Sequence, residues 1–172
     1  MTPTIYLIGS LRNPRIPRLG KQIRTLGYDV FDEWHGAGPR ADDEWQKYEQ
    51  TRGRSYTEAL NGLAAETIFK FDLKHLDRAH IGLLVLPAGK SAHLELGYML
   101  GTHKIGIVLF EGEPARYDVM YKFAHHICLS EDELTVCLTG LLPTFNGGDA
   151  YGAIDRIDYP VGGGDVFKRP TA

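Results

Sequence analysis

The sequence has few cysteines, no excess of positive charge and no long hydrophobic run. Two cysteines in 172 residues form neither a disulfide framework nor a zinc site, so we expect a reducing, cytoplasmic location. The net charge is −3, and without a basic surface we expect no binding of extended nucleic acid. The longest apolar runs, such as 81–87, are too short to cross a bilayer, and no signal peptide is visible, so we expect no membrane contact.

Several catalytic signatures are missing as well. The loop 9–13 has neither the glycine pattern of a dinucleotide site nor that of a P-loop. The histidines show no spacing typical of metal ligands, and no G-x-S-x-G motif is present. We therefore expect neither a metal ion nor an organic cofactor.

Short apolar runs alternate with helical patterns along most of the chain. Strands are expected over 5–8, 28–31, 81–86, 105–110 and 126–129, and helices over 19–26, over 91–102 and after a capping box at 130–133. Strands that are apolar on both faces favour a parallel sheet covered by helices. The expected fold is α/β, a Rossmann-like or flavodoxin-like three-layer sandwich with a five-stranded parallel sheet.

Two regions interrupt this alternation. Residues 33–71 form a long insertion, expected to be two helices broken near 52–54. Residues 141–172 are rich in Gly and Pro with interspersed aromatics, typical of a loose terminus or of an arm that packs elsewhere. We therefore expect one α/β domain over 1–140, followed by a C-terminal arm.

Ligands of open parallel sheets bind outside the carboxyl ends of the strands. Three expected loops reach these ends, namely 9–13, 87–91 and 111–113. Loops 9–13 and 87–91 each enter a helix, whose first N–H groups favour an anion. Ser10 and Arg12 are candidate ligands there, although taken alone the loop is more often an ordinary strand-to-helix turn with an exposed arginine. His93 lies at the start of the expected helix 91–102 and is a further candidate for substrate contact.

Two carboxylates suggest glycosidic chemistry. With Ser91 as the expected N-cap, Glu95 would lie in the first helical turn, where the helix dipole favours its ionised form. An ionised carboxylate beside an anomeric carbon is the nucleophile of a retaining glycosyl transfer, and a second carboxyl group delivers a proton. Asp72 is the candidate for that second group and Asp77 competes with it, while ordinary solvated helix acids are the alternative explanation.

Three segments in the same order resemble the nucleoside 2-deoxyribosyltransferase family, most closely its small bacterial and phage-type branch. They are Ile5-Tyr6-Leu7-Ile8-Gly9-Ser10-Leu11-Arg12-Asn13, the segment 72–80 (DLKHLDRAH) and the segment 89–98 (GKSAHLELGY). With 104–109 and 127–134, the resemblance covers residues 4–138. It implies a Rossmann-like fold and cleavage of the N-glycosidic bond of a 2′-deoxynucleoside through a covalent deoxyribosyl-enzyme intermediate.

The resemblance also implies roles for individual residues. By position, Glu95 corresponds to the nucleophile, Asp72 to the aspartate that handles the proton on the leaving base, and Tyr6 to the tyrosine that orients the nucleophile. The chain departs from the family at His80, where many relatives have Asp. It also departs at Gly89, where Ser91 would take over sugar or phosphate contacts.

Three functions remain open at this stage. The first is a transferase that moves the deoxyribosyl group to another free nucleobase, with Trp34 as a stacking face for the base or as a packing anchor. The second is an N-glycosidase of 2′-deoxynucleoside 5′-monophosphates, in which Gly9, Ser10 and Arg12 form the phosphate loop. The third is a nucleotide sensor without turnover. The resemblance further implies a homo-oligomer, because the family usually completes its site with residues of a neighbour.

Overall fold

The computed structural model describes residues 2–147, and the expected arm from residue 148 onward lies outside the described residues. Five parallel strands form one sheet in the order β2-β1-β3-β4-β5. They are β1 (Thr4–Ile8), β2 (Asp29–Phe31), β3 (Ile81–Val85), β4 (Ile105–Leu109) and β5 (His126–Cys128). This is the flavodoxin-like strand order, and it confirms the fold class expected from the sequence.

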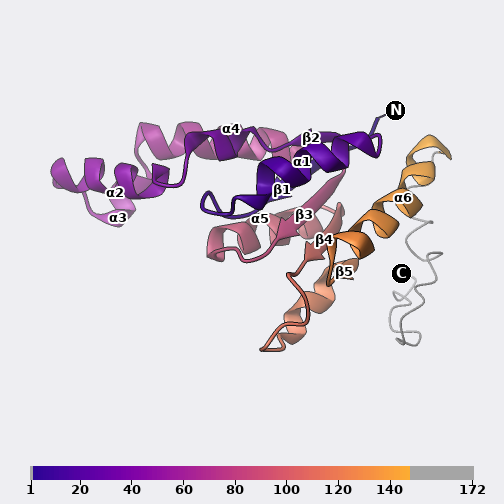
Figure 1. Ribbon diagram of the computed structural model, residues 1–172. Helices are drawn as coiled ribbons and strands as arrows, with labels where there is room; N and C mark the ends of the chain where they lie inside the picture. The colour runs from indigo at the N-terminus through magenta and orange to yellow at the C-terminus, as the bar shows by residue number, and fades with distance from the viewer. Residues whose placement is uncertain (1, 148–172) are drawn as a thin grey trace, which may run out of the picture.

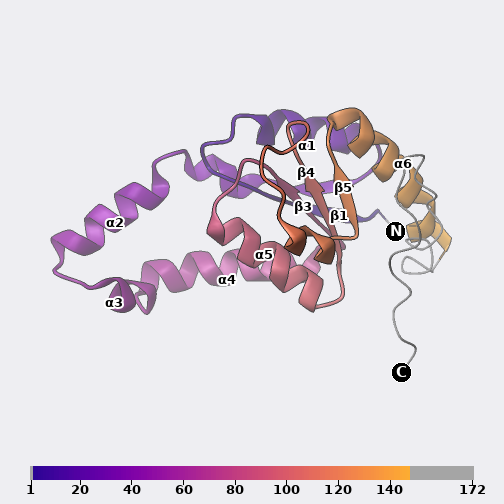
Figure 2. The same cartoon turned by 90° about the horizontal axis from the view of Figure 1, so that it is seen from below.

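Helices cover both faces of the sheet (Figures 1 and 2). Helices α1 (Arg15–Thr25) and α6 (Glu131–Gly147) pack on one face, and α4 (Leu63–Arg78) and α5 (Lys90–Gly101) pack on the other. Alternation along β1 divides its side chains between the two layers, because Ile5 and Leu7 face α1 whereas Tyr6 and Ile8 face α5. The result is a three-layer sandwich with a separate apolar core on each side of the sheet.

The ends of α1 and α6 follow sequence signals. Gly27, with φ of 97°, follows the end of α1 in the left-handed conformation that glycine adopts without strain. Ser130 Oγ accepts a hydrogen bond from the Glu133 N–H, as the expected capping box requires, although Glu133 in turn accepts from Leu129. Helix α6 continues through Gly147, so the boundary expected at residue 140 falls inside a helix whose Leu141 is fully buried.

The insertion contains three α-helices rather than two. A 3-10 turn, η1 (Glu33–Ala37), leads to α2 (Ala41–Thr51), and the chain then breaks at 52–54 as expected. A short helix α3 (Tyr56–Leu60) precedes α4, with Asn61 as the C-cap of α3 and the extended Gly62 as the N-cap of α4. Helix α4 extends beyond residue 71 to Arg78, which places Asp72 within a helix. Helices α2, α3 and the first half of α4 project away from the sheet (Figure 1).

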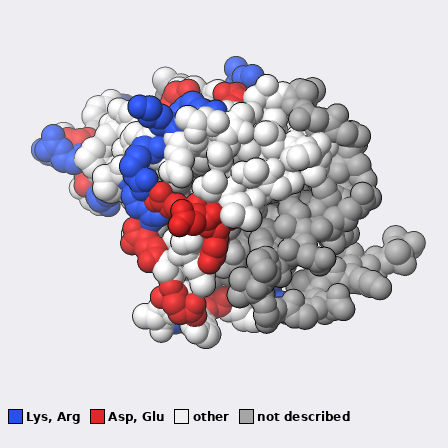
Figure 3. Space-filling view, turned by 45° about the vertical axis from the view of Figure 1, so that its right-hand side comes forward, with Lys and Arg blue, Asp and Glu red and all other residues white. Residues whose placement is uncertain are grey.

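No helix among residues 2–147 is both long and apolar enough to pass through a bilayer. Over the same residues, no group of three or more His, Cys, Asp or Glu side chains is arranged to hold a metal ion. On the face shown in Figure 3, basic and acidic side chains lie next to one another, and neither sign covers a broad area alone.

Candidate active site

Tyr6, Asp72 and Glu95 come together on the α4/α5 face of the sheet. Tyr6 lies on β1, paired with β2 on one side and with Gly82 of β3 on the other, and is only 1% exposed. Asp72 comes from α4 and Glu95 from α5, and both are half-buried. The charges of both carboxylates raise the pKa of Tyr6, after a larger contribution from burial. Three side chains that lie far apart in the sequence therefore form one electrostatic unit.

The start of α5 differs from the sequence expectation. The helix begins at Lys90 with Gly89 as its N-cap, so Ser91 is not the cap and lies exposed at the second helical position. Glu95 is therefore in the second turn, beyond the region where a helix dipole acts strongly. The first-turn prediction was wrong because Gly89, in an extended conformation, starts the helix two residues early.

Glu95 is also not held in its ionised form. Burial, and then the charge of Asp72, raise the pKa of Glu95 from an ordinary 4.5 to about 7. The expectation of a readily ionised carboxylate was therefore wrong, because the loss of water around Glu95 outweighs the helix dipole. Near neutral pH, protonated and ionised Glu95 are both populated.

Asp72, rather than Asp77, is the partner of Glu95. Burial raises the pKa of Asp72, while hydrogen bonding by Tyr6 and the charge of His75 oppose that rise. Asp77 is exposed, and its Oδ1 accepts a hydrogen bond of 2.6 Å from the Tyr98 hydroxyl. The two acids compared in the sequence thus face different surroundings, and only Asp72 contributes to the pKa of Glu95.

An aromatic wall beside these carboxylates was missed in the sequence. The ring of His75 stacks on Phe31 with centroids 3.8 Å apart, and Phe31 in turn lies 5.0 Å from Tyr6. Phe71 contacts both Phe31 and His75 and remains 46% exposed. The i, i+3 spacing of Asp72 and His75 on one helix face was the available signal.

Trp34 is partly buried and packs against both apolar cores. Its Nε1 donates a 2.7 Å hydrogen bond to the carbonyl oxygen of Leu7. The structure therefore shows the packing role of Trp34, whereas stacking on a base stays a prediction.

A cavity of about 350 Å³ lies at the carboxyl ends of the central strands. We call it the edge pocket, and it is lined by Ser10, Arg12, Asn13, Arg15, Gly89 and Glu111, among others. Ser10, Arg12 and Gly89 were expected here as ligands. Asn13 and Glu111 belong to loops that were expected at this edge but were not named as ligands, and Arg15 was not expected here. Ser10 Oγ accepts a hydrogen bond from the Arg12 N–H, and the Arg12 guanidinium is paired with Asp43 of α2 at 2.7 Å.

Gly9 and His93 have supporting positions near the edge pocket. A Cβ on Gly9 would lie 2.9 Å from the side chain of Ile16, so Gly9 permits the close approach of α1. The ring nitrogens of His93 bond to the Gly89 carbonyl oxygen at 2.7 Å and to the Tyr121 hydroxyl at 2.9 Å. His93 thus joins the start of α5 to the 3-10 turn η2 (Val119–Phe123), while its contact with substrate stays a prediction.

Comparisons with known proteins bear on the fold. No protein-family model matches the chain, and no curated protein is significantly similar to it. Among solved structures, the chain is similar to a conserved protein from Enterococcus faecalis V583, with a TM-score of 0.54 and 14% sequence identity. The match covers 80% of this chain and 98% of that chain. The likeness therefore shows the α/β fold and nothing of the chemistry.

Proposed function

We propose that the protein is an enzyme that cleaves the N-glycosidic bond of 2′-deoxynucleosides and transfers the sugar to another nucleobase, as nucleoside 2-deoxyribosyltransferases do. The observation that carries this proposal is the meeting of Tyr6 with two half-buried carboxylates, Asp72 and Glu95, on one face of the sheet. Two carboxyl groups, one to attack and one to move a proton, are what glycosidic bond cleavage requires.

In the first step, ionised Glu95 attacks C1′ of the sugar. The new bond joins C1′ to a Glu95 oxygen, the C1′–N bond breaks, and its electron pair leaves with the base. Asp72, whose pKa is raised by burial, gives a proton to the departing base. Tyr6, which remains a phenol because its own pKa is raised, donates a hydrogen bond to Asp72 and lies beside Glu95.

In the second step, a nitrogen of the acceptor base attacks C1′ from the face that the first base left. The ester bond to Glu95 breaks, its electron pair returns to the carboxylate, and the proton of the acceptor base passes to Asp72. Two inversions at C1′ give overall retention of configuration. None of these steps requires a metal ion or an organic cofactor.

A second candidate is hydrolysis of 2′-deoxynucleoside 5′-monophosphates, with water in place of the acceptor base. The observation in its favour is that Ser10, Arg12 and Gly89 line one pocket. In this reaction Arg12 would break its exposed ion pair with Asp43 in order to bind the phosphate. The cost would be small, because exposed ion pairs contribute little to stability.

We also propose that the protein works as a homo-oligomer in the cytoplasm. Large apolar side chains are exposed along the projecting helices α3 and α4, namely Tyr56, Leu60, Leu63, Ile68, Phe69 and Phe71. Exposed apolar surface of this extent is typical of an interface, and Phe71 directly precedes Asp72. Cys128 and Cys137 are both buried and form no disulfide bond, as suits a reducing compartment.

The test is chromatography of deoxynucleosides and their 5′-monophosphates, each with and without a second free base. We expect a new deoxynucleoside to form only with acceptor base, and Glu95→Gln and Asp72→Asn to lose activity by about 1000-fold or more. Asp77→Asn is the matched control and should keep activity, since Asp77 bonds to Tyr98 away from Glu95. Trapping with a 2-fluoro sugar analogue should leave an adduct on Glu95.

Other results would change the assignment. Base release chiefly from monophosphates would favour the hydrolase, and an adduct on another residue would refute the role of Glu95. Saturable binding of nucleotides without any turnover would leave a sensor as the function.

A further inference from the structure

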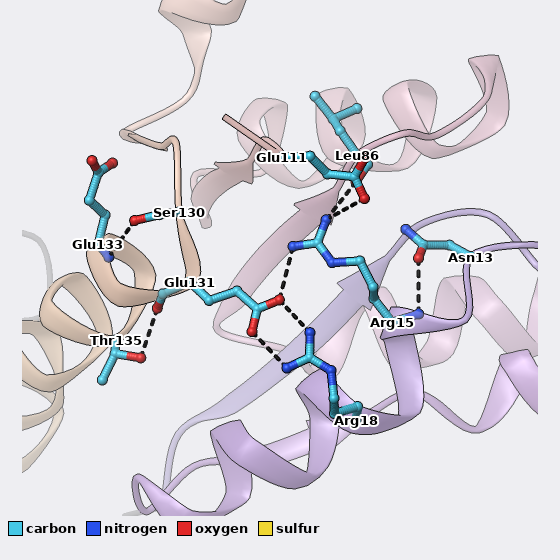
Figure 4. Close-up of polar contacts among 9 residues, drawn as sticks. All are labelled: Asn13, Arg15, Arg18, Leu86, Glu111, Ser130, Glu131, Glu133 and Thr135. Atoms are coloured by element: carbon cyan, nitrogen blue, oxygen red, sulfur yellow. Dashed lines mark hydrogen bonds and ion pairs between the residues drawn. The ribbon is translucent and has the colours of Figure 1, made fainter. Parts of the chain in front are cut away.

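The positive charges around the edge pocket are balanced by the negative charges of carboxylates. Three guanidinium groups at or beside it are each paired with a carboxylate, in the pairs Arg12–Asp43, Arg15–Glu111 and Arg18–Glu131. A second contact of 3.0 Å joins Arg15 to Glu131. Figure 4 shows the contacts of Arg15 and Arg18, which join the start of α1 to the loop after β4 and to the first turn of α6. A doubly charged ligand would therefore have to compete with carboxylates that are already in place.

The Arg15 guanidinium group is held by three hydrogen bonds within the protein. Its Nη1 donates to the Leu86 carbonyl oxygen at 3.3 Å and to Glu111 Oε1 at 2.8 Å, and its Nη2 donates to Glu131 Oε1 at 3.0 Å. Both terminal nitrogens are thus engaged, and the side chain is only 19% exposed. Arg15 therefore fixes the position of the Glu111 carboxylate, which lines the pocket and has acceptor sites beyond the one that Arg15 uses.

Asn13 supplies a donor that still needs an acceptor. Asn13 is only 5% exposed. Its Oδ1 accepts a 3.0 Å hydrogen bond from the backbone N–H of Arg15, and this bond fixes the orientation of the side-chain amide. Within residues 2–147, the buried Asn13 Nδ2 has no hydrogen-bond partner. Figure 4 shows this nitrogen on the side of the amide that faces the Arg15 side chain. A buried unpaired donor is unfavourable, so an acceptor from a ligand would relieve that cost.

The edge pocket lies at the N-terminal end of α5, the helix that carries Glu95. Gly89, which lines the pocket, precedes Glu95 by six residues, and α5 rises about 9 Å over that span. Side chains of a helix lean toward its N-terminus, so the Glu95 carboxyl group lies closer to the pocket than its backbone does. With C1′ at Glu95, the 5′ end of the sugar would extend toward Asn13 and Glu111.

We propose that Asn13 and Glu111 bind the 5′-hydroxyl group of the deoxynucleoside and that Glu111 excludes a 5′-phosphate; this inference rests on the proposed function. The hydroxyl oxygen accepts from Asn13 Nδ2, and the hydroxyl proton is donated to Glu111. A hydroxyl group is the substituent that satisfies both partners, because it is at once donor and acceptor. A phosphate would satisfy Asn13 but would place its charge beside a fixed carboxylate.

The test compares kcat/KM for a deoxynucleoside and for its 5′-monophosphate in the wild type and in Glu111→Gln. The wild type should prefer the nucleoside, and Glu111→Gln should shift the ratio toward the monophosphate by about tenfold or more, since glutamine keeps the shape and an acceptor for Arg15. Asn13→Asp keeps the oxygen that bonds to the Arg15 N–H but loses the donor. It should lower kcat/KM for the nucleoside about tenfold and have little effect on a 2′,5′-dideoxynucleoside.

Each opposite result overturns the inference in a recognisable way. A wild type that prefers the monophosphate, or a ratio unchanged in Glu111→Gln, would refute the 5′ selectivity while the proposed chemistry stands. An equal loss in Asn13→Asp on both nucleosides would assign Asn13 to loop structure alone. Absence of base release from every substrate by the wild type would remove the proposed function and this inference together.

Discussion

At the scale of single residues, Glu95 meets two opposing requirements. A nucleophile must be ionised, whereas burial beside Asp72 favours the protonated form and raises the pKa of Glu95 to about 7. Because the carboxyl groups of Glu95 and Asp72 interact, they titrate as a pair. The same burial strengthens electrostatic interactions with a developing oxocarbenium ion, which is the gain that offsets partial protonation.

This pKa leads to a prediction of pH dependence. The reactive form of the pair has Glu95 ionised and one proton on Asp72. The kcat/KM of the wild type should therefore fall as the pH rises above about 7, because the pair then loses that proton. The measurement is a pH–rate profile on a deoxynucleoside from about pH 5 to about pH 9. A rate that stays constant above about pH 7 would contradict the role of this proton.

Unfolding measurements test the same pKa without activity. Glu95 has a higher pKa in the folded state than in the unfolded state, so its proton stabilises the folded state at low pH. This stabilisation is lost as the pH rises through about 7. Glu95→Gln should therefore equal the wild type in free energy of unfolding below about pH 4.5 and exceed it by up to roughly 3 kcal/mol at about pH 8. Exposed Asp77→Asn serves as the control. A difference that does not change with pH would indicate a Glu95 that is not desolvated.

At the scale of elements, two glycines set the height of α5 above the sheet. Gly82 and Gly106 are paired in register on β3 and β4, and Tyr6 pairs with Gly82 from the other side. A Cβ on Gly82 would lie 2.5 Å from Met99 Sδ, and one on Gly106 would lie 2.6 Å from Leu100. The absence of these side chains lets α5 approach the sheet and brings Glu95 near Tyr6.

Substitution of Gly82 should therefore damage both stability and the site. We expect Gly82→Val to lower the free energy of unfolding by about 1–3 kcal/mol, because α5 must shift, and to reduce kcat more than KM changes. Denaturant unfolding and steady-state kinetics measure the two effects. Gly97→Ala on the same helix meets no atom within 4 Å and should instead stabilise by about 0.5–1 kcal/mol.

A partner variant separates steric overlap from other effects. Met99→Ala removes the side chain that a new Cβ on Gly82 would meet, so the double variant should lose less stability than the sum of the two single losses. Strict additivity would show that Gly82 does not limit the approach of α5 through Met99.

The sequence predicted the elements better than the contacts between them. Continuous apolar runs located β3 and β4 because strands covered on both faces need apolar residues throughout. The start of α5 was misplaced because serine is a commoner N-cap than glycine, and no local signal shows that Gly89 is extended. The edge pocket network could not be predicted, since Arg15, Glu111 and Glu131 meet across nearly the whole chain.

The pKa of Glu95 depends on a similar long-range effect. The prediction that Glu95 is ionised came from its position in a helix, which is a local property. The burial that raises its pKa depends instead on the fold. Asp72 and Asp77 likewise looked equivalent in the sequence, and only the packing of α4 turns Asp72 toward Tyr6.

At the scale of the whole molecule, the projecting helices present apolar side chains that this chain leaves uncovered. Leu63, Ile68 and Phe69 on α4 are each more than half exposed, and the first half of that helix lies beyond the sheet (Figure 2). A second copy would bury this surface and would lie beside Phe71 and Asp72, so association would also shield the proposed site from water.

We therefore expect the wild type to form an oligomer at micromolar concentration and Phe69→Glu to be a monomer, as measured by light scattering, because a charge buried in an apolar interface is strongly unfavourable. Val136→Glu, at a comparably exposed position on α6 and away from α4, is the control and should leave the mass unchanged. If the neighbouring copy shields the site, Phe69→Glu should lose activity when it becomes a monomer. Its thermal unfolding should remain cooperative. A wild type that is monomeric at these concentrations would rule out the interface, and the exposed face of α4 would then have to be covered by something other than a second copy.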